Sequence, residues 1–126
     1  MQQAGVAHYL RAMADMTGID TCALVDVETG MAWHVAGRLP QQDVLVEAAT
    51  DYWRMYLRSR SVPKPYGELR AHIMLYAQGR MTIAPCGDGT VLVCFSQDAQ
   101  PIDWSAWMQQ ARVLQSHLMQ ARSHGT

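Results

Sequence analysis

The side chains that could carry out chemistry are thinly spread along this sequence. The five histidines show no pair at i, i+4 spacing and no H-E-x-x-H pattern, so they predict no metal site. Both glycine-rich phosphate loops, G-x-x-x-x-G-K-S/T and G-x-G-x-x-G, are missing, as is a nucleophile elbow. We therefore expect no cofactor, no metal and no catalytic residues, in a protein that is not an enzyme.

The cysteines and one acidic pair are the remaining candidates for reactivity. Cys22, Cys86 and Cys94 form no C-x-x-C pair and lie in apolar surroundings, which favours buried thiols in a reducing compartment. Cys86 follows a proline and precedes a G-D-G turn, so it is the cysteine that could be more exposed. Asp26 and Glu28 resemble a pair of catalytic carboxylates, but their place in a tight turn favours solvated turn residues.

Composition narrows the class of protein further. The 126 residues carry a net charge of −1, which does not favour a nucleic-acid partner. Charged residues make up 17% and apolar residues 49%, so the chain buries much of itself or presents apolar surface to a partner. No apolar run reaches the roughly 18 residues of a membrane span, and the first residues do not resemble a signal peptide. We expect one cytoplasmic domain over residues 1–126.

The elements follow from hydrophobic periodicity and turn residues. Apolar residues at three- and four-residue spacing predict a helix over 4–17, which ends at Thr17-Gly18. Further helices are expected from Pro40 to about residue 60 and from Asp103 onward, where Asp103 is a good N-cap. Strands are expected over 21–27, 31–36, 69–77, 80–85 and 91–95.

This order predicts an α+β domain of three layers, a five-stranded antiparallel sheet with helices on both faces. The order of elements is helix, two strands, helix, three strands, helix. Residues 21–25 and 91–95 are apolar at both alternating positions, so these strands are expected at the sheet centre. Residues 31–36 and 69–77 alternate in polarity and are expected nearer the edges.

The middle helix is unusual because its apolar arc is too wide. In VLVEAATDYWRMYL, residues 44–57, apolar side chains cover roughly 220° of the helix, whereas a surface helix needs about 100°. The segment also carries Trp53 and Tyr56, of residue types that dominate binding hot spots, beside Arg54, Arg58 and Arg60. The aromatic residues could contact a second copy, fill the core or bind another protein. The arginines could steer an acidic partner or form a solvated face.

Two stretches of the sequence resemble the roadblock family of the dynein light-chain type, whose fold is related to longin and profilin domains. TGIDTCALVDVETGMAWHVAG resembles the opening of that family and GRMTIAPCGDGTVLVCF its closing hairpin, within a likeness that spans about residues 4–122. The resemblance implies the strand order second, first, fifth, fourth, third, in agreement with the centre and edges expected from polarity.

The resemblance also implies a homodimer, in which the middle helices of two copies pack side by side and the third strands pair edge to edge. The interface would then comprise Leu45, Val46, Ala49, Trp53, Tyr56, Leu57, Arg70, His72, Met74 and Tyr76. Such a dimer would explain the wide apolar arc, because one side of the helix would face its own sheet and the other its twin.

The expected function is a non-catalytic interaction module that regulates or scaffolds a Ras-like small GTPase system. Its partners would be a second copy of itself and a small GTPase or another roadblock-like subunit. The alternative is a small-molecule sensor of the PAS-like or profilin-like type, with Trp33, Trp104 and Trp107 lining a cavity.

Overall fold

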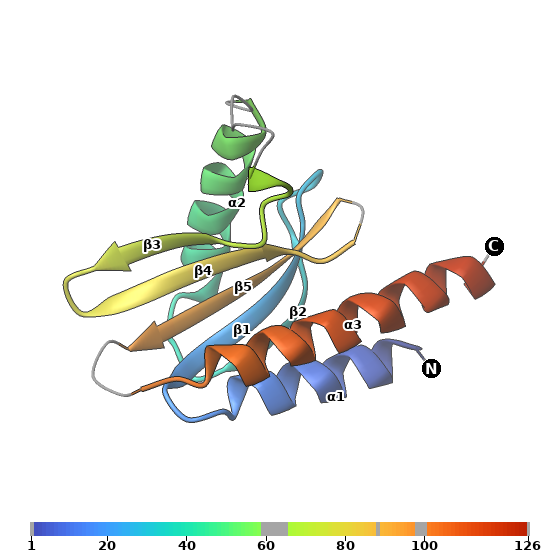
Figure 1. Cartoon of the computed structure of the whole chain (residues 1–126), viewed down its shortest axis with the longest axis horizontal. Helices are drawn as coiled ribbons and strands as arrows, with labels where there is room; N and C mark the ends of the chain where they lie inside the picture. Colours follow the sequence, from blue (N-terminus) through green and yellow to red (C-terminus); the bar gives the residue numbers. More distant parts are fainter. Residues whose placement is uncertain (1, 59–65, 88, 98–100, 126) are drawn as a thin grey trace.

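The computed structural model describes residues 2–58, 66–87, 89–97 and 101–125. The helices are α1 (Gln2–Ala14), α2 (Gln42–Arg58) and α3 (Trp104–Gly125). The strands are β1 (Ile19–Asp26), β2 (Ala32–Gly37), β3 (His72–Tyr76), β4 (Gly79–Pro85) and β5 (Thr90–Gln97). Their order along the chain is the one that the sequence predicts (Figure 1).

The strands form one antiparallel sheet in the order β2-β1-β5-β4-β3, which confirms the predicted topology. The two strands that are apolar at both alternating positions, β1 and β5, lie next to each other and are almost wholly buried. The strands with alternating polarity, β2 and β3, form the two edges. Burial on both faces therefore decides which strands take the centre, as the polarity pattern predicts.

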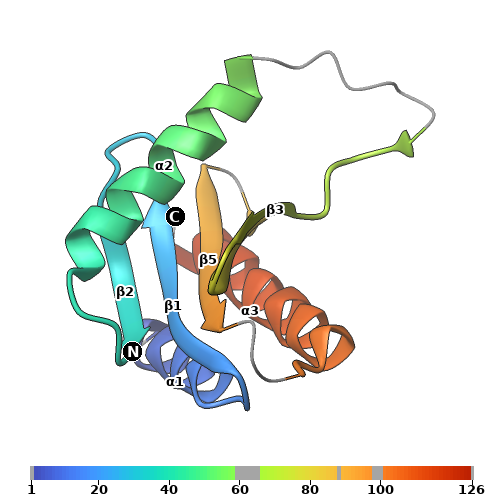
Figure 2. The ribbon, with the colours of Figure 1, turned by 90° about the vertical axis from the view of Figure 1, so that its left-hand side faces the viewer.

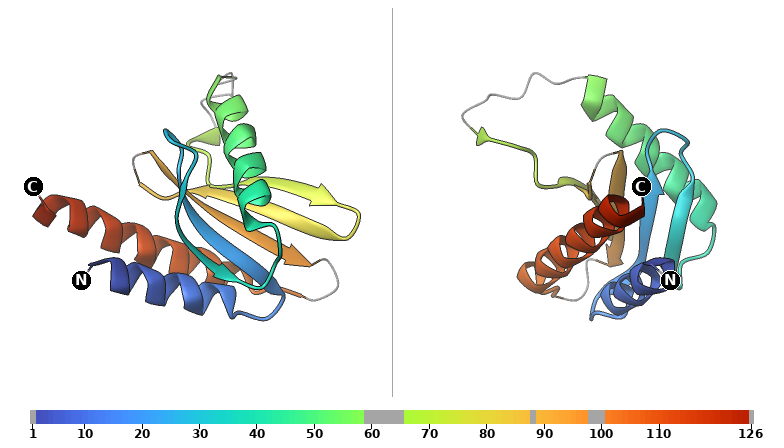
Figure 3. Two further views of the ribbon diagram at one scale, coloured as in Figure 1. Left: turned by 180° about the vertical axis from the view of Figure 1, so that it is seen from behind. Right: turned by 90° about the vertical axis from the view of Figure 1, so that its right-hand side faces the viewer.

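Helices cover both faces of this sheet, and each face has its own hydrophobic core. The helices α1 and α3 lie side by side on one face, whereas α2 crosses the other (Figure 2). Leu10, Met13, Trp107 and Leu114 fill the core beneath α1 and α3. The helix α1 begins and α3 ends at the same end of the molecule, opposite the tip of the β3–β4 hairpin (Figure 3).

A close backbone approach at Gly37 sets the direction in which the chain leaves β2 for α2. Gly37 has a φ of 139°, a conformation that L side chains rarely adopt. A Cβ atom there would lie 2.3 Å from the carbonyl oxygen of Asp20. Just beyond it, the amide of Leu39 donates a hydrogen bond of 3.0 Å to Oγ1 of Thr21, which is buried. Only glycine therefore fits where β2 ends and the connection to α2 begins.

Candidate interaction surface

The inner face of α2 belongs to the core of the chain itself. Val46, Ala49 and Trp53 are buried against the sheet, where they pack with residues of β1, β4 and β5. Thr50 is buried with them and donates a 2.9 Å hydrogen bond to the carbonyl oxygen of Val46. The i, i+3, i+7 spacing of the three apolar residues places them on one side of the helix. They were expected at the interface with a second copy, but they are core residues.

The outer face of α2 is apolar as well, and it faces solvent. Val44, Ala48, Tyr52 and Met55 form a row at i, i+4, i+8 and i+11, which we call the outer stripe. Val44 is 60% and Met55 53% exposed, and the other two are half-buried. They belong to the middle helix that was expected to pack against a second copy, but the sequence reasoning did not name them among the interface residues, although they lie opposite Val46 on the helical wheel. The outer stripe is the part of the wide apolar arc that the chain leaves uncovered.

Between these two faces, α2 contacts the edge strand β3 through aromatic residues. The rings of Tyr56 and His72 meet edge-on, with 6.4 Å between their centroids. The hydroxyl of Tyr76 donates to the hydroxyl of Tyr52 at 3.4 Å, and this bond raises the pKa of Tyr76. Leu45 and Leu57, like Tyr56, are half-buried and pack at the margin of the core. The side chains of α2 that face β3 and the side chains of β3 that face α2 thus form one continuous surface.

Within the described residues, β3 pairs with β4 on one side and has no neighbouring strand on the other. Met74 is half-buried toward α2, whereas Ile73 and Leu75 point to the opposite face and are 51% and 72% exposed. Tyr76, at the end of the strand, is exposed too. A free strand edge that carries exposed apolar side chains is a pairing surface for another chain. Ile73 and Leu75 belong to the strand that was expected to pair with a second copy, but the sequence reasoning did not name them among the interface residues.

The strand β3 is shorter than predicted, because it begins at His72 and not at residue 69. In its register with β4, His72 lies opposite Ile83, so Arg70 would lie opposite Pro85. Proline has no N–H to donate, and the ladder stops before it. Arg70 was expected on the interface strand; instead it precedes the strand, is exposed and lines a groove beside α3.

The arginines of α2 do not form one steering patch. The guanidinium of Arg54 donates to the carbonyl oxygen of Val27 at 3.2 and 2.7 Å, and to that of Glu28 at 3.0 Å. Arg54 therefore fastens α2 to the β1–β2 turn, and this corrects the expectation that it is free to attract a partner. Arg58, at the end of α2, is exposed and could serve that role. Arg60 lies outside the described residues.

The groups with reactive potential are used structurally. The carboxylate of Asp26 accepts hydrogen bonds from the amide of Glu28 and the hydroxyl of Thr29, both at 3.1 Å, as a turn residue does. Cys86 is buried, contrary to the expectation that it could be exposed, and burial raises its pKa to about 12. Within the described residues, no group of histidines, cysteines and carboxylates could hold a metal ion.

The tryptophans do not share a cavity. Trp107 is fully buried, and Trp104 packs against it edge-on with 5.7 Å between ring centroids. The guanidinium of Arg80 lies 5.4 Å from the ring centroid of Trp104. Trp33 is exposed on β2. None of the three lines the groove of about 1010 Å³ beside α3 in the described structure, so the arrangement expected of a tryptophan-lined sensor pocket is not formed.

The sheet order and the three-layer arrangement define the roadblock/LC7 fold, and solved structures of that fold match nearly the whole chain. A roadblock/LC7 domain from Streptomyces avermitilis is 13% identical, with a TM-score of 0.73 over 94% of this chain and 95% of that one. An MglB in a tetrameric arrangement is 15% identical, with a TM-score of 0.76 over 95% and 92%.

The gliding protein MglB from Thermus thermophilus is 14% identical, with a TM-score of 0.73 over 93% of this chain and 87% of that one. At such identities the likeness shows a shared fold. No protein-family model and no curated protein sequence matches the chain. Across the described residues, none of the helices has the length and apolar character that crossing a bilayer requires.

Proposed function

We propose that the chain is a non-catalytic, roadblock-type interaction module in the cytoplasm, a single domain that forms a homodimer. The observation that supports this most directly is the outer stripe of α2 lying beside the free edge of β3. One symmetric contact, as in an isologous dimer, would cover the outer stripe and pair the free edge of β3. Ile73 and Leu75, which point to the face opposite α2, would gain cross-strand neighbours in that pairing. The fold's match to a tetrameric MglB agrees with self-association.

The contact would have two parts with different physical roles. Pairing of β3 with β3 of a second copy would satisfy the backbone groups of the free edge and remove an aggregation-prone surface. Packing of the outer stripe against the same stripe of the second copy would bury Val44 and Met55, which supply apolar area. The revised interface therefore consists of Val44, Ala48, Tyr52 and Met55 with Ile73, Leu75 and the edge of β3. Leu45, Tyr56, Leu57, His72, Met74 and Tyr76 lie at its inner margin.

The proposed partner of the dimer is a Ras-like small GTPase. The dimer would regulate this GTPase or act as a scaffold that brings it together with its other regulators. The support for this step is the resemblance to the roadblock family and the shared fold with MglB. The sequence contains no phosphate-binding loop, so the nucleotide would belong to the partner. Another roadblock-like subunit could replace the second copy, since the same stripe and edge would pair with any chain of equivalent surface.

Sedimentation equilibrium tests the dimer. The wild-type chain should be a dimer at micromolar concentration, and Met55→Glu should make it a monomer, because burying an unpaired carboxylate at the contact is costly. The matched control is Val113→Glu, on an exposed apolar residue of α3 away from the outer stripe, which should remain dimeric. A wild-type chain that is monomeric at micromolar concentration would refute the proposal.

The GTPase link needs a separate measurement. A Ras-like GTPase from the same genome, loaded with GDP or with a GTP analogue, should bind the wild-type dimer with a preference for one nucleotide state. If binding is equally negligible in both nucleotide states, the proposed link to a GTPase is refuted. The proposed dimer does not depend on that result.

A further inference from the structure

The edge strand β3 extends beyond the helices on the sheet face that carries α1 and α3. On this face β4 is covered, because Thr82 and Ala84 are buried and Arg80 lies against the ring of Trp104. The helix α1 packs against β1 and β2 and lies beside α3 (Figure 2). Ile73 belongs to this face because it lies opposite Thr82, which in turn lies opposite Cys94 of the core under α3. The exposed Ile73 and Leu75 therefore mark an uncovered margin on the face opposite α2.

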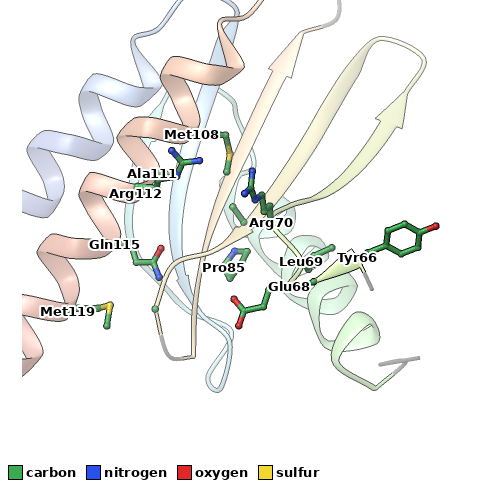
Figure 4. A pocket seen from close by; sticks show the side chains of 13 residues that line it. Tyr66, Glu68, Leu69, Arg70, Pro85, Met108, Ala111, Arg112, Gln115 and Met119 are labelled. Carbon is green, nitrogen blue, oxygen red and sulfur yellow. The ribbon is translucent and has the colours of Figure 1, made fainter. Parts of the chain in front are cut away.

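A groove lies beside α3. Its volume is about 1010 Å³, and its floor includes Ala84 and Pro85 of β4. One wall is the side of α3 that carries Met108, Arg112, Gln115 and Met119, and the other is the segment Gly67–Arg70 (Figure 4). The residues of α3 recur at i, i+4, i+7 and i+11, the spacing of a helix side that packs against another helix.

The groove suits a helical ligand because the wall formed by α3 is itself the side of a helix. Packed helices lie about 8–10 Å apart, so a second helix could lie along this wall. An extended peptide would not gain backbone hydrogen bonds here, because the groove lies over a sheet face and not along a strand edge.

The charges on the walls indicate what kind of helix fits. Arg112 on α3 and Arg70 on the opposite wall are both exposed, and Glu68 is the acidic residue among those that line the groove. Within the described residues, neither guanidinium forms an ion pair. A ligand with carboxylates on its two flanks would meet one arginine on each wall, while its apolar side would cover Met108 and Met119.

We propose that this groove binds an amphipathic helix of a partner protein, apolar on one side and acidic along its flanks. This site lies on the face opposite α2, so it does not depend on the proposed dimer. It gives the module a second surface, by which it would hold a helical segment while the outer stripe and β3 contact another copy.

A designed peptide tests the proposal. The probe is a helical peptide of about 14 residues, roughly 20 Å long, with leucines on one side and glutamates on its flanks. Methyl resonances of the methionines report its position: those of Met108 and Met119 should shift on binding, whereas those of Met31 and Met55, which are exposed elsewhere, should not. The same experiment on Met55→Glu should give the same shifts, which separates a failure of the groove from a failure of the dimer.

Charge reversal supplies the second readout. Arg70→Glu and Arg112→Glu should each weaken binding of the acidic peptide about two- to fivefold, the range for exposed charge pairs. The double variant, which carries both substitutions, should bind a peptide with lysines in place of the glutamates more tightly than it binds the acidic peptide. Arg11→Glu, on an exposed residue of α1 with the same change in charge, is the matched control and should leave affinity unchanged.

Each of four results would overturn the proposal. The first is an absence of shifts at a peptide concentration of about 1 mM. The second is equal affinity for the acidic and the lysine peptide, and the third is shifts centred on Met31 or Met55. The fourth is a shift of Met108 and Met119 with protein concentration alone, since that would show a second copy in the groove.

Discussion

The guanidinium of Arg54 donates two hydrogen bonds to the carbonyl oxygen of Val27, at 3.2 and 2.7 Å, across the gap between α2 and the β1–β2 turn. This contact fixes where α2 sits on the sheet. It therefore also fixes the direction in which the outer stripe faces.

Loss of this contact should weaken the fold. Arg54→Leu should lower the free energy of unfolding by about 2 kcal/mol, because the carbonyl oxygens lose charged donors. Urea unfolding at one fixed protein concentration measures this, since a dimer's stability depends on concentration. Arg58→Leu, at an exposed position one turn further on, should change stability by less than about 0.5 kcal/mol. Equal effects of the two substitutions would contradict the anchoring role.

The close approach at Gly37 predicts a second stability difference. Gly37→Ala should cost more than about 3 kcal/mol, because a Cβ atom would meet the carbonyl oxygen of Asp20 in addition to the strained φ. Gly87→Ala is the control: its φ is 92°, but nothing lies within 4 Å of the added atom. That variant should therefore lose only about 1 kcal/mol, the cost of backbone strain alone. Thermal unfolding compares them, and similar losses would argue against the steric reason.

Burial of Cys86 predicts a loss of stability in alkaline solution. Its folded pKa, about 12, lies above the ordinary value of 9.0, so the folded chain keeps a proton that the unfolded chain releases. The stabilisation is complete below pH 9 and is lost between pH 9 and about 12, by about 1 kcal/mol for each pH unit. Comparison of the wild type with Cys86→Ala from about pH 8 to about pH 10 isolates this contribution. Parallel stability curves for the two proteins would show that the thiol does not titrate as argued.

The five-residue length of β3 predicts the register of the dimer. A two-fold axis through its middle residue, Met74, gives the longest pairing, and it places Ile73 of one copy opposite Leu75 of the other. A mixture of the Ile73→Cys and Leu75→Cys chains should therefore form a disulfide between the two different variants in preference to either alone. The native cysteines are buried and should not compete. Non-reducing electrophoresis separates the products, and a preference for self-pairing at one position would place the axis elsewhere.

The polarity of the strands was enough to predict which of them lie at the centre and which nearer the edges, because burial on both faces leaves a clear signature in β1 and β5. The full strand order followed from the resemblance to the roadblock family. The helix α2 shows where such reasoning stops. With about 220° of apolar surface, no polar boundary marks which part faces the sheet, and Val46 and Trp53 were placed on the wrong side. Arg54 illustrates a second limit. Its charge is visible in the sequence, whereas the carbonyl oxygens within its reach become visible only once the turn and helix are in place.

The first residues of α1 and the last residues of α3 lie at the same end of the molecule, away from the tip of the β3–β4 hairpin (Figure 1). In an antiparallel union through β3, the two pairs of ends would emerge at opposite poles of the assembly. Proteins or fluorescent labels fused to the termini of the two copies would therefore be separated by roughly the combined length of both subunits.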